Sequence, residues 1–174
     1  ALSAELNQRQ LDHLYRKRNS HDGPQRPQLK INGQTLLAFC SNDYLGLANH
    51  PALIRAAQNA CVDYGLGSGA SHLVAGHTDV HHELEEALAK LTQRPRALLF
   101  SSGYMANMGV LSSLLDRQDA VYQDRLNHAS LLDGGLLSAA KLQRYRHQDL
   151  SDLQRQLDKT QARRHLVATD AVFS

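Results

Sequence analysis

Apolar positions along the chain fall into helical and strand-like patterns, which alternate regularly over its second half. Apolar residues three or four positions apart predict helices over residues 3–18, 51–64, 78–91, 105–115, 128–140 and 149–157. Short apolar runs predict strands over residues 97–100, 119–124, 141–145 and 165–173. Strands that alternate with helices predict the α/β class, a mainly parallel sheet with helices on both faces.

The front of the chain has a different pattern. Two short apolar runs flank Asn32-Gly33, the dipeptide most typical of a tight β-hairpin. Residues 19–28 are polar and predict a linker, and residues 39–51 predict an irregular segment. We therefore expect an N-terminal helix and hairpin segment over residues 1–45 and the front part of an α/β domain over residues 46–174. Because the last predicted strand runs to the end of the sequence, we expect the chain to be part of a longer protein.

Composition narrows the class of protein. Apolar residues make up 42% and charged residues 21% of the 174, which is typical of a folded globular chain. The 19 basic and 17 acidic residues nearly balance, and the single dense basic cluster is residues 16–18, so nucleic acid is not an expected partner. Cys40 and Cys61 have neither metal nor redox spacing. With no membrane-length apolar run and no signal-peptide core, we expect a cytoplasmic protein.

The turn Ser101-Ser102-Gly103 lies where a predicted strand gives way to a helix. Free backbone N–H groups and the positive end of a helix dipole meet at such a point, and both attract phosphate. A P-loop is excluded, because no Gly-Lys-Ser/Thr follows at the required spacing. Two interpretations stay open, a phosphate site for a group other than a nucleotide and a plain turn.

Asn127 and His128 directly follow the predicted strand 119–124. Ligands of open parallel sheets bind beyond the carboxyl ends of the strands, and Ser102-Gly103 occupies the equivalent place after the preceding predicted strand. We therefore expect these two groups at the same edge of one sheet. The alternative for His128 is a helix cap or an exposed histidine, and this pattern does not choose between them.

Histidines and glutamates gather at the start of the predicted helix 78–91. The pairs His81/Glu85 and His82/Glu86 are four residues apart, and His77 lies just before them. Such pairs bind a metal or form solvated ion pairs. Because no His-Glu-x-x-His motif is present and the cysteines lie elsewhere, we favour ion pairs and predict no metal site.

Three further motifs favour ordinary structural roles when taken alone. The glycine-rich residues 65–71 follow a predicted helix, whereas a dinucleotide-binding glycine motif follows a strand, so we predict a flexible loop. Asp43, within SNDYLGL, is typical of an Asx turn. Residues 16–18 suit a solvated helix end.

Together these motifs resemble the α-oxoamine synthases, a family of pyridoxal-phosphate (PLP) enzymes of the fold type I, aminotransferase-like group. The resemblance covers essentially the whole chain, in the family's order. The motifs that carry it are FCSNDYLGLANHP (39–51), GLGSGASHLVAGHTDVHHELEEALAKL (65–91), ALLFSSGYMAN (97–107), DRLNHASLLDG (124–134) and VFS (172–174). Ala70, His72 and Asp170-Ala171 depart from the family pattern and affect the expected loop shapes.

The resemblance implies a role for each matching residue. Ser102, Gly103 and Tyr104 are expected to hold the cofactor, and His128 to stack on its ring and touch the substrate. Ser174 is expected to hydrogen-bond the phenolic oxygen of PLP.

On the substrate side, the resemblance assigns three residues. Asn42 is expected to line the active site near a dimer interface, and Arg16 to contact the substrate carboxylate. His128 is the implied catalytic residue, and no metal is implied.

The implied activity is a decarboxylative condensation of an amino acid with an acyl thioester in a homodimer. RYRHQD (144–149) leans towards the biotin-pathway branch, whose partners are L-alanine and pimeloyl-CoA or a pimeloyl carrier protein. The family's Schiff-base lysine and its ring-nitrogen aspartate match no residue of this chain, so residues 1–174 alone are expected to be inactive. The alternatives are 2-amino-3-oxobutyrate CoA-ligase, 5-aminolevulinate synthase, serine palmitoyltransferase or a non-catalytic interaction module.

Overall fold

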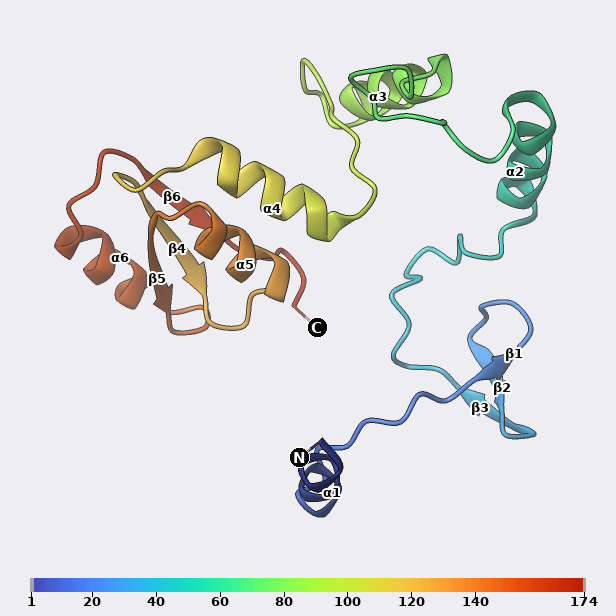
Figure 1. The fold of residues 1–174 in the computed structure, drawn as a ribbon, viewed down its shortest axis with the longest axis horizontal. Coiled ribbons are helices and arrows are strands. Elements are labelled where there is room, and N and C mark those ends of the chain that lie inside the picture. Colours follow the sequence, from blue (N-terminus) through green and yellow to red (C-terminus); the bar gives the residue numbers. More distant parts are fainter. Residues whose placement is uncertain (1, 174) are drawn as a thin grey trace. The chain divides into compact units, whose positions relative to one another are not determined.

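A computed structural model describes residues 2–173 (Figure 1). The chain divides into two compact units, residues 1–69 and residues 70–174, and each is described by itself. The boundary between residues 45 and 46 that the sequence suggests stays a prediction.

The first unit holds two helices and a small antiparallel sheet. Its elements in chain order are α1 (Leu2–Leu11), β1 (His21–Asp22), β2 (Gln28–Ile31), β3 (Gln34–Leu37) and α2 (Pro51–Tyr64). The predicted hairpin is confirmed, with Asn32 at φ 50° and Gly33 at φ 78° between β2 and β3. Two consecutive positive φ values define the type I′ turn, which Asn-Gly favours. β1 adds an antiparallel strand within the segment that was predicted to be a linker.

The first helix is shorter than the sequence predicts. It ends at Leu11 instead of residue 18, because His13 adopts the left-handed conformation at φ 57°. The Leu14 N–H donates to the Arg9 carbonyl at 2.8 Å and the His13 N–H to the Gln10 carbonyl at 3.2 Å. This pair of bonds is a Schellman motif, which closes a helix. The basic residues 16–18 therefore lie beyond the helix.

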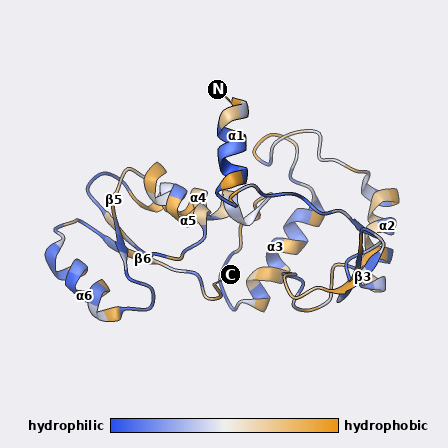
Figure 2. Cartoon of the chain, turned by 90° about the horizontal axis from the view of Figure 1, so that it is seen from below, coloured by the Kyte–Doolittle hydropathy of each residue, from blue (hydrophilic) through white to orange (hydrophobic). Residues whose placement is uncertain are grey.

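No described residue of the first unit is buried. Phe39 and Leu66, for example, are 94% and 92% exposed. Figure 2 shows hydrophobic residues along α2, a helix without a single buried side chain. The first unit thus has secondary structure without a hydrophobic core of its own.

The second unit is built around a three-stranded parallel sheet in the order β5-β4-β6. Its elements are α3 (Asp79–Leu91), α4 (Gly103–Leu114), β4 (Ala120–Asp124), α5 (Ala129–Leu137), β5 (Lys141–Tyr145), α6 (Leu150–Lys159) and β6 (His165–Ala168). Every residue of the central strand β4 is buried. This confirms the predicted α/β class with a parallel sheet.

Alternate residues of β4 enter two separate cores. Val121 packs with Leu111 and Leu131 from α4 and α5 on one face. Tyr122 packs with Leu153 and other residues around α6 on the opposite face. Because successive strand residues point to opposite faces, the predicted cover of helices on both faces is confirmed.

One predicted strand is absent, and another is shorter than predicted. Residues 97–100 form no strand, because they pair with no other strand in the described part of the chain. β6 ends at Ala168 instead of residue 173. There the Asn127 side chain donates to the Ala168 carbonyl at 2.7 Å and accepts from the Asp170 N–H at 3.2 Å. The Asn127 side chain thus takes the hydrogen bonds that a neighbouring strand would make, and the ladder between β4 and β6 ends here.

Gly134 permits the close approach between α4 and α5. A Cβ at Gly134 would lie 3.0 Å from the Asn107 carbonyl oxygen and 3.0 Å from Leu111 Cδ1. We expect Gly134→Val to destabilise the protein by about 1–3 kcal/mol, because overpacking forces the two helices apart. Urea unfolding measures the loss. Ser113→Val, at an exposed position of α4, is the matched control, and equal stability of the two variants would contradict the packing argument.

None of the described helices has both the length and the apolar character needed to span a membrane.

Candidate functional site at the carboxyl edge of the sheet

Ser102 begins the first half of the site by capping α4. Its Oγ accepts a hydrogen bond from the Met105 N–H at 3.2 Å. Gly103 and Tyr104 follow as the first residues of the helix, where backbone N–H groups have no partner within the helix. The turn is therefore a helix N-terminus, the arrangement that attracts anions.

His128 begins the second half of the site by capping α5. Its Nδ1 accepts from the Ser130 N–H at 3.2 Å and lies 2.7 Å from Ser130 Oγ. The Asn107 side chain donates to the same Oγ at 2.9 Å, and the His128 N–H donates to Asp170 at 2.6 Å. The helix-cap interpretation of His128 is thus confirmed. Since donors face Nδ1, the ring proton resides on Nε2, and Nε2 and the ring faces are left for other contacts.

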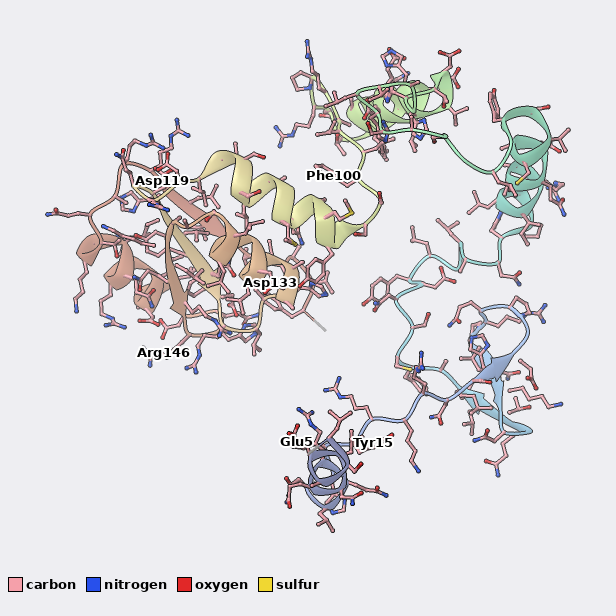
Figure 3. The ribbon with its side chains drawn as sticks, in the orientation of Figure 1. Glu5, Tyr15, Phe100, Asp119, Asp133 and Arg146 are labelled. Carbon is pink, nitrogen blue, oxygen red and sulfur yellow. The ribbon has the colours of Figure 1, made fainter. Side chains whose placement is uncertain are left out.

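Tyr104 joins the two helix N-termini. Its ring centroid lies 6.0 Å from that of His128, with the rings at 78° to each other. Its hydroxyl donates to the carboxylate of Asp133 on α5, which Figure 3 labels. The hydrogen bond to Asp133 raises the pKa of Tyr104 above its ordinary value. Tyr104 thus links the start of α4 to His128 and α5. The predicted reason for this placement does not hold for Ser102, because residues 97–100 before it form no strand.

Asp124, the last residue of β4, binds the loops at this edge of the sheet, and this role was not predicted from the sequence. It is 2% exposed at the end of β4 and accepts from the N–H groups of Leu126 at 2.8 Å and Gln148 at 3.0 Å. His147 Nδ1 lies 3.0 Å from the same carboxylate. Burial alone would raise the pKa of Asp124, but the hydrogen bonds outweigh it and lower the pKa. The carboxylate thus stays charged and fixes the two loops that follow β4 and β5.

A second group of carboxylates stabilises the sheet elsewhere. Asp119 is fully buried at the amino end of β4, and Arg163 donates to it at 3.0 and 2.9 Å. Figure 3 shows Asp119 and Arg146 at opposite ends of the sheet. Asp152 accepts from the Arg146 N–H at 2.9 Å. These acids hold loops and strand ends, and none of their described hydrogen bonds reaches His128.

These carboxylates predict how stability depends on pH. Hydrogen bonds lower the pKa of Asp119, with Arg163 as the largest cause, and the Arg146 N–H and further donors lower that of Asp152 to about 2. A lowered pKa stabilises the fold above the ordinary value near 3.8, and this stabilisation is lost as pH falls towards 2. We expect the urea midpoint to decrease steadily from pH 5 to pH 2.5. Asp152→Asn should show a flatter profile, and a profile as steep as that of the parent would contradict this account.

The structure does not place the other predicted site residues at this edge of the sheet. Arg16 and Asn42 belong to the first unit, where both are exposed, and their substrate roles stay predictions. The predicted Asx turn at Asp43 is wrong in type, because Asp43 Oδ1 accepts from the Leu47 N–H at 2.8 Å and the Ala48 N–H at 3.2 Å instead of from the N–H two residues on. Ser174 lies outside the described residues.

Sequence reasoning missed the supporting groups Asn107, Asp124, Ser130, Asp133 and Asp170. Most of their partners lie 20 or more residues away in the chain, beyond the reach of local patterns. For Asp124 alone a signal existed, an acidic residue that directly ends a buried parallel strand.

The chain is similar in sequence to a known family and to several of its members. The family model for class I and II aminotransferases matches residues 34–174. The 8-amino-7-oxononanoate synthase of Nitrosococcus oceani is 61% identical over 170 residues, which are 98% of this chain and 45% of that protein. The Cellvibrio japonicus enzyme of the same name is 60% identical over 173 residues, 99% of this chain and 44% of that protein. The chain thus spans about 45% of the length of these relatives.

Solved structures show the same architecture. Sphingomonas wittichii serine palmitoyltransferase superposes with a TM-score of 0.88 at 30% identity, over 99% of this chain and 44% of that one. A serine palmitoyltransferase variant from S. paucimobilis, solved with bound PLP and myriocin, superposes with a TM-score of 0.88 at 29% identity, over 99% of this chain and 44% of that one. Francisella tularensis 8-amino-7-oxononanoate synthase gives 0.66 at 39% identity, over 78% of this chain and 37% of that one.

Proposed function

Because the chain belongs to the class I and II aminotransferase family, we propose that it forms the front part of an 8-amino-7-oxononanoate synthase. The observation that carries this proposal is the 61% identity to such a synthase over 98% of the chain. The proposed reaction is the decarboxylative condensation of L-alanine with a pimeloyl thioester. A carbon–carbon bond forms at the thioester carbonyl, the carbon–sulfur bond breaks to release the thiol, and the alanine carboxylate leaves as carbon dioxide.

The proposed cofactor is PLP, and the residues at the N-terminus of α4 fit its phosphate. The backbone N–H groups at the start of the helix are free of intrahelical partners. A Cβ at Gly103 would meet nothing within 4 Å, so the space beside this backbone is open. Bound PLP supplies an electron sink for the carbanion that forms at the amino acid. Ser102, Gly103 and Tyr104 would hold its phosphate end.

His128 fits the role of a ring that stacks on the cofactor and contacts the substrate. The orientation of its ring is fixed by the Ser130 N–H and Oγ, so little side-chain entropy is lost when a flat group packs against it. With its proton on Nε2, it can donate a hydrogen bond to a substrate oxygen without carrying a charge. Its proposed role is thus to orient and to donate a proton in a hydrogen bond.

The proposal also includes residues beyond this edge. Arg16 would bind the substrate carboxylate and Asn42 would line the site, in a homodimer. Ser174 would bind the phenolic oxygen of PLP. The lysine that carries PLP is not matched within the chain. Lys141 lies at the amino end of β5, the opposite edge from His128, where it donates to the Gln161 carbonyl at 2.8 Å.

A substrate comparison on the complete purified protein tests the proposal. L-alanine with pimeloyl-CoA is expected to release free thiol and carbon dioxide much faster than glycine with acetyl-CoA or with succinyl-CoA. Serine with palmitoyl-CoA is included because the serine palmitoyltransferase structures superpose well. A preference for glycine or serine would overturn the proposal in favour of another oxoamine synthase, and no turnover with any pair would favour an interaction module. A protein of residues 1–174 alone is the negative control.

A further inference from the structure

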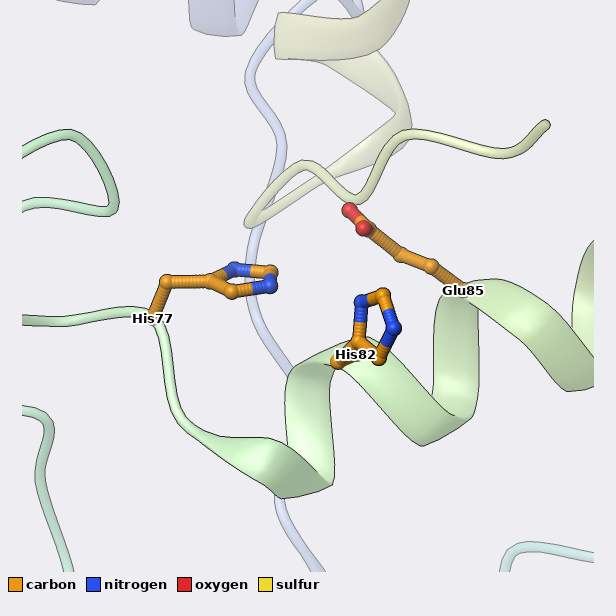
Figure 4. Close-up of side chains that lie close together, drawn as sticks. All are labelled: His77, His82 and Glu85. Carbon is orange, nitrogen blue, oxygen red and sulfur yellow. The ribbon is translucent and has the colours of Figure 1, made fainter.

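Three metal-ligating side chains meet at the start of α3, away from the site described above. His77 lies in the loop before the helix, and His82 and Glu85 lie in its first turns. One potential ligand atom from each lies within 4.8 Å of the other two (Figure 4). We propose that His77, His82 and Glu85 bind a divalent transition metal of the zinc type.

The backbone before α3 brings the third ligand into place. The Gly76 N–H donates to the Ser71 carbonyl at 2.9 Å, which folds residues 71–76 into a tight loop. A Cβ at Gly76 would lie 1.9 Å from the Ala70 carbonyl oxygen, so only glycine fits this position. The loop therefore places His77 beside His82. The sequence pattern alone favours ion pairs, because it relates residues on one helix and does not reveal this turn.

Outer contacts leave one nitrogen of each histidine for the metal. Nδ1 of His77 lies 2.9 Å from Nδ1 of His72, so its Nε2 is left for a ligand. Nε2 of His82 lies 3.3 Å from the Glu86 carboxylate, so its Nδ1 is left. Metal-bound histidines in proteins almost always have their second nitrogen engaged in this way, which fixes the ring orientation.

Glu85 is positioned in the same manner. Its Oε1 accepts from the Leu99 N–H at 3.1 Å, and the side chain is half-buried. Two imidazoles and one carboxylate are a common zinc ligand set, with a fourth position for water. Ligand atoms around a tetrahedral zinc lie about 3.4 Å apart, so small rotations of the exposed histidines complete the geometry.

Zinc titration of the metal-free and PLP-free protein tests this site directly. The experiment uses a protein without a histidine tag and with Cys40→Ser and Cys61→Ser, because both thiols are free and exposed. Calorimetry is expected to show one equivalent of zinc. His82→Ala is expected to weaken the affinity about 100-fold or more, and Glu86→Gln about 10-fold, the range for loss of an outer partner.

Matched controls separate ligation from general charge. Glu83→Gln changes an exposed carboxylate on the same helix, and its zinc affinity should equal that of the parent. Co²⁺ in place of zinc should give the intense visible absorption of a tetrahedral site, and His82→Ala should lack it. The proposal is overturned if no saturable zinc binding occurs, or if His82→Ala binds as tightly as the parent. Far-UV circular dichroism of each variant checks that the total helical content is unchanged.

Discussion

Replacing His128 with alanine in the complete protein is expected to lower kcat/KM for condensation about 100-fold. Two proposed contacts are lost together, ring stacking on the cofactor and a hydrogen bond to the substrate, which contribute about 1 and 2 kcal/mol. The variant also loses the α5 cap formed by His128 Nδ1 and the Ser130 N–H, which costs about 1 kcal/mol of stability. Steady-state kinetics and PLP titration measure the functional part, and urea unfolding measures the structural part.

His128→Asn distinguishes the ring from the cap. Asparagine is a good N-cap residue, so this variant should keep the stability of the parent. It lacks the aromatic ring, so its kcat/KM should fall as far as that of the alanine variant. If His128→Asn were as active as the parent, loss of the cap alone would explain the low activity of His128→Ala. The proposed stacking role would then be wrong. The outcome does not depend on which thioester the enzyme uses.

Replacing Asp124 with alanine is expected to destabilise the protein by about 3 kcal/mol. The carboxylate is almost fully buried and satisfies the N–H groups of Leu126 and Gln148. Without it, both N–H groups lose a charged acceptor, and a hydrogen bond to a charged group contributes about 1.5–3 kcal/mol. Urea unfolding at pH 7 measures the difference in free energy.

Asp124→Asn and Asp158→Ala complete this experiment. Asparagine keeps one acceptor oxygen, so its loss should be smaller than that of alanine. Asp158 is exposed at the end of α6, and its removal should change stability by less than about 0.5 kcal/mol. A loss for Asp124→Ala as small as that of Asp158→Ala would refute the account of Asp124 as the support of the two loops.

Local patterns predicted those parts of the fold that depend on neighbouring residues. The hairpin follows from Asn32-Gly33 alone, and α4, α5 and α6 follow from apolar spacing and caps. The errors occur where distant residues decide. β1 exists through pairing with β2, and residues 97–100 lack the partner that a strand requires. The end of α1 was missed because it depends on the left-handed conformation of His13, and histidine is not a typical helix stop signal.

The site follows the same division. Ser102 and His128 were placed correctly because each sits where a helix begins, a boundary that the sequence marks. The groups that support His128 come from elsewhere in the chain and meet only in the folded unit. Asn107 acts through Ser130, and Asp170 accepts from the His128 backbone N–H. A single chain sequence relates positions along one element, so it predicts the capping residues better than their partners.

The central place of β4 has a consequence for folding kinetics. Ala120 pairs with Lys141 on β5 and with His165 on β6, so both of its ladders join residues far apart in the chain. Closing such loops costs entropy before any ladder bond compensates for it, which makes parallel pairing slow. We infer that β4, α5 and β5 form the folding nucleus, since their connection is the shorter one, and that β6 docks last. Until it docks, one edge of the buried strand stays open, and this interval is when the chain is most exposed to aggregation.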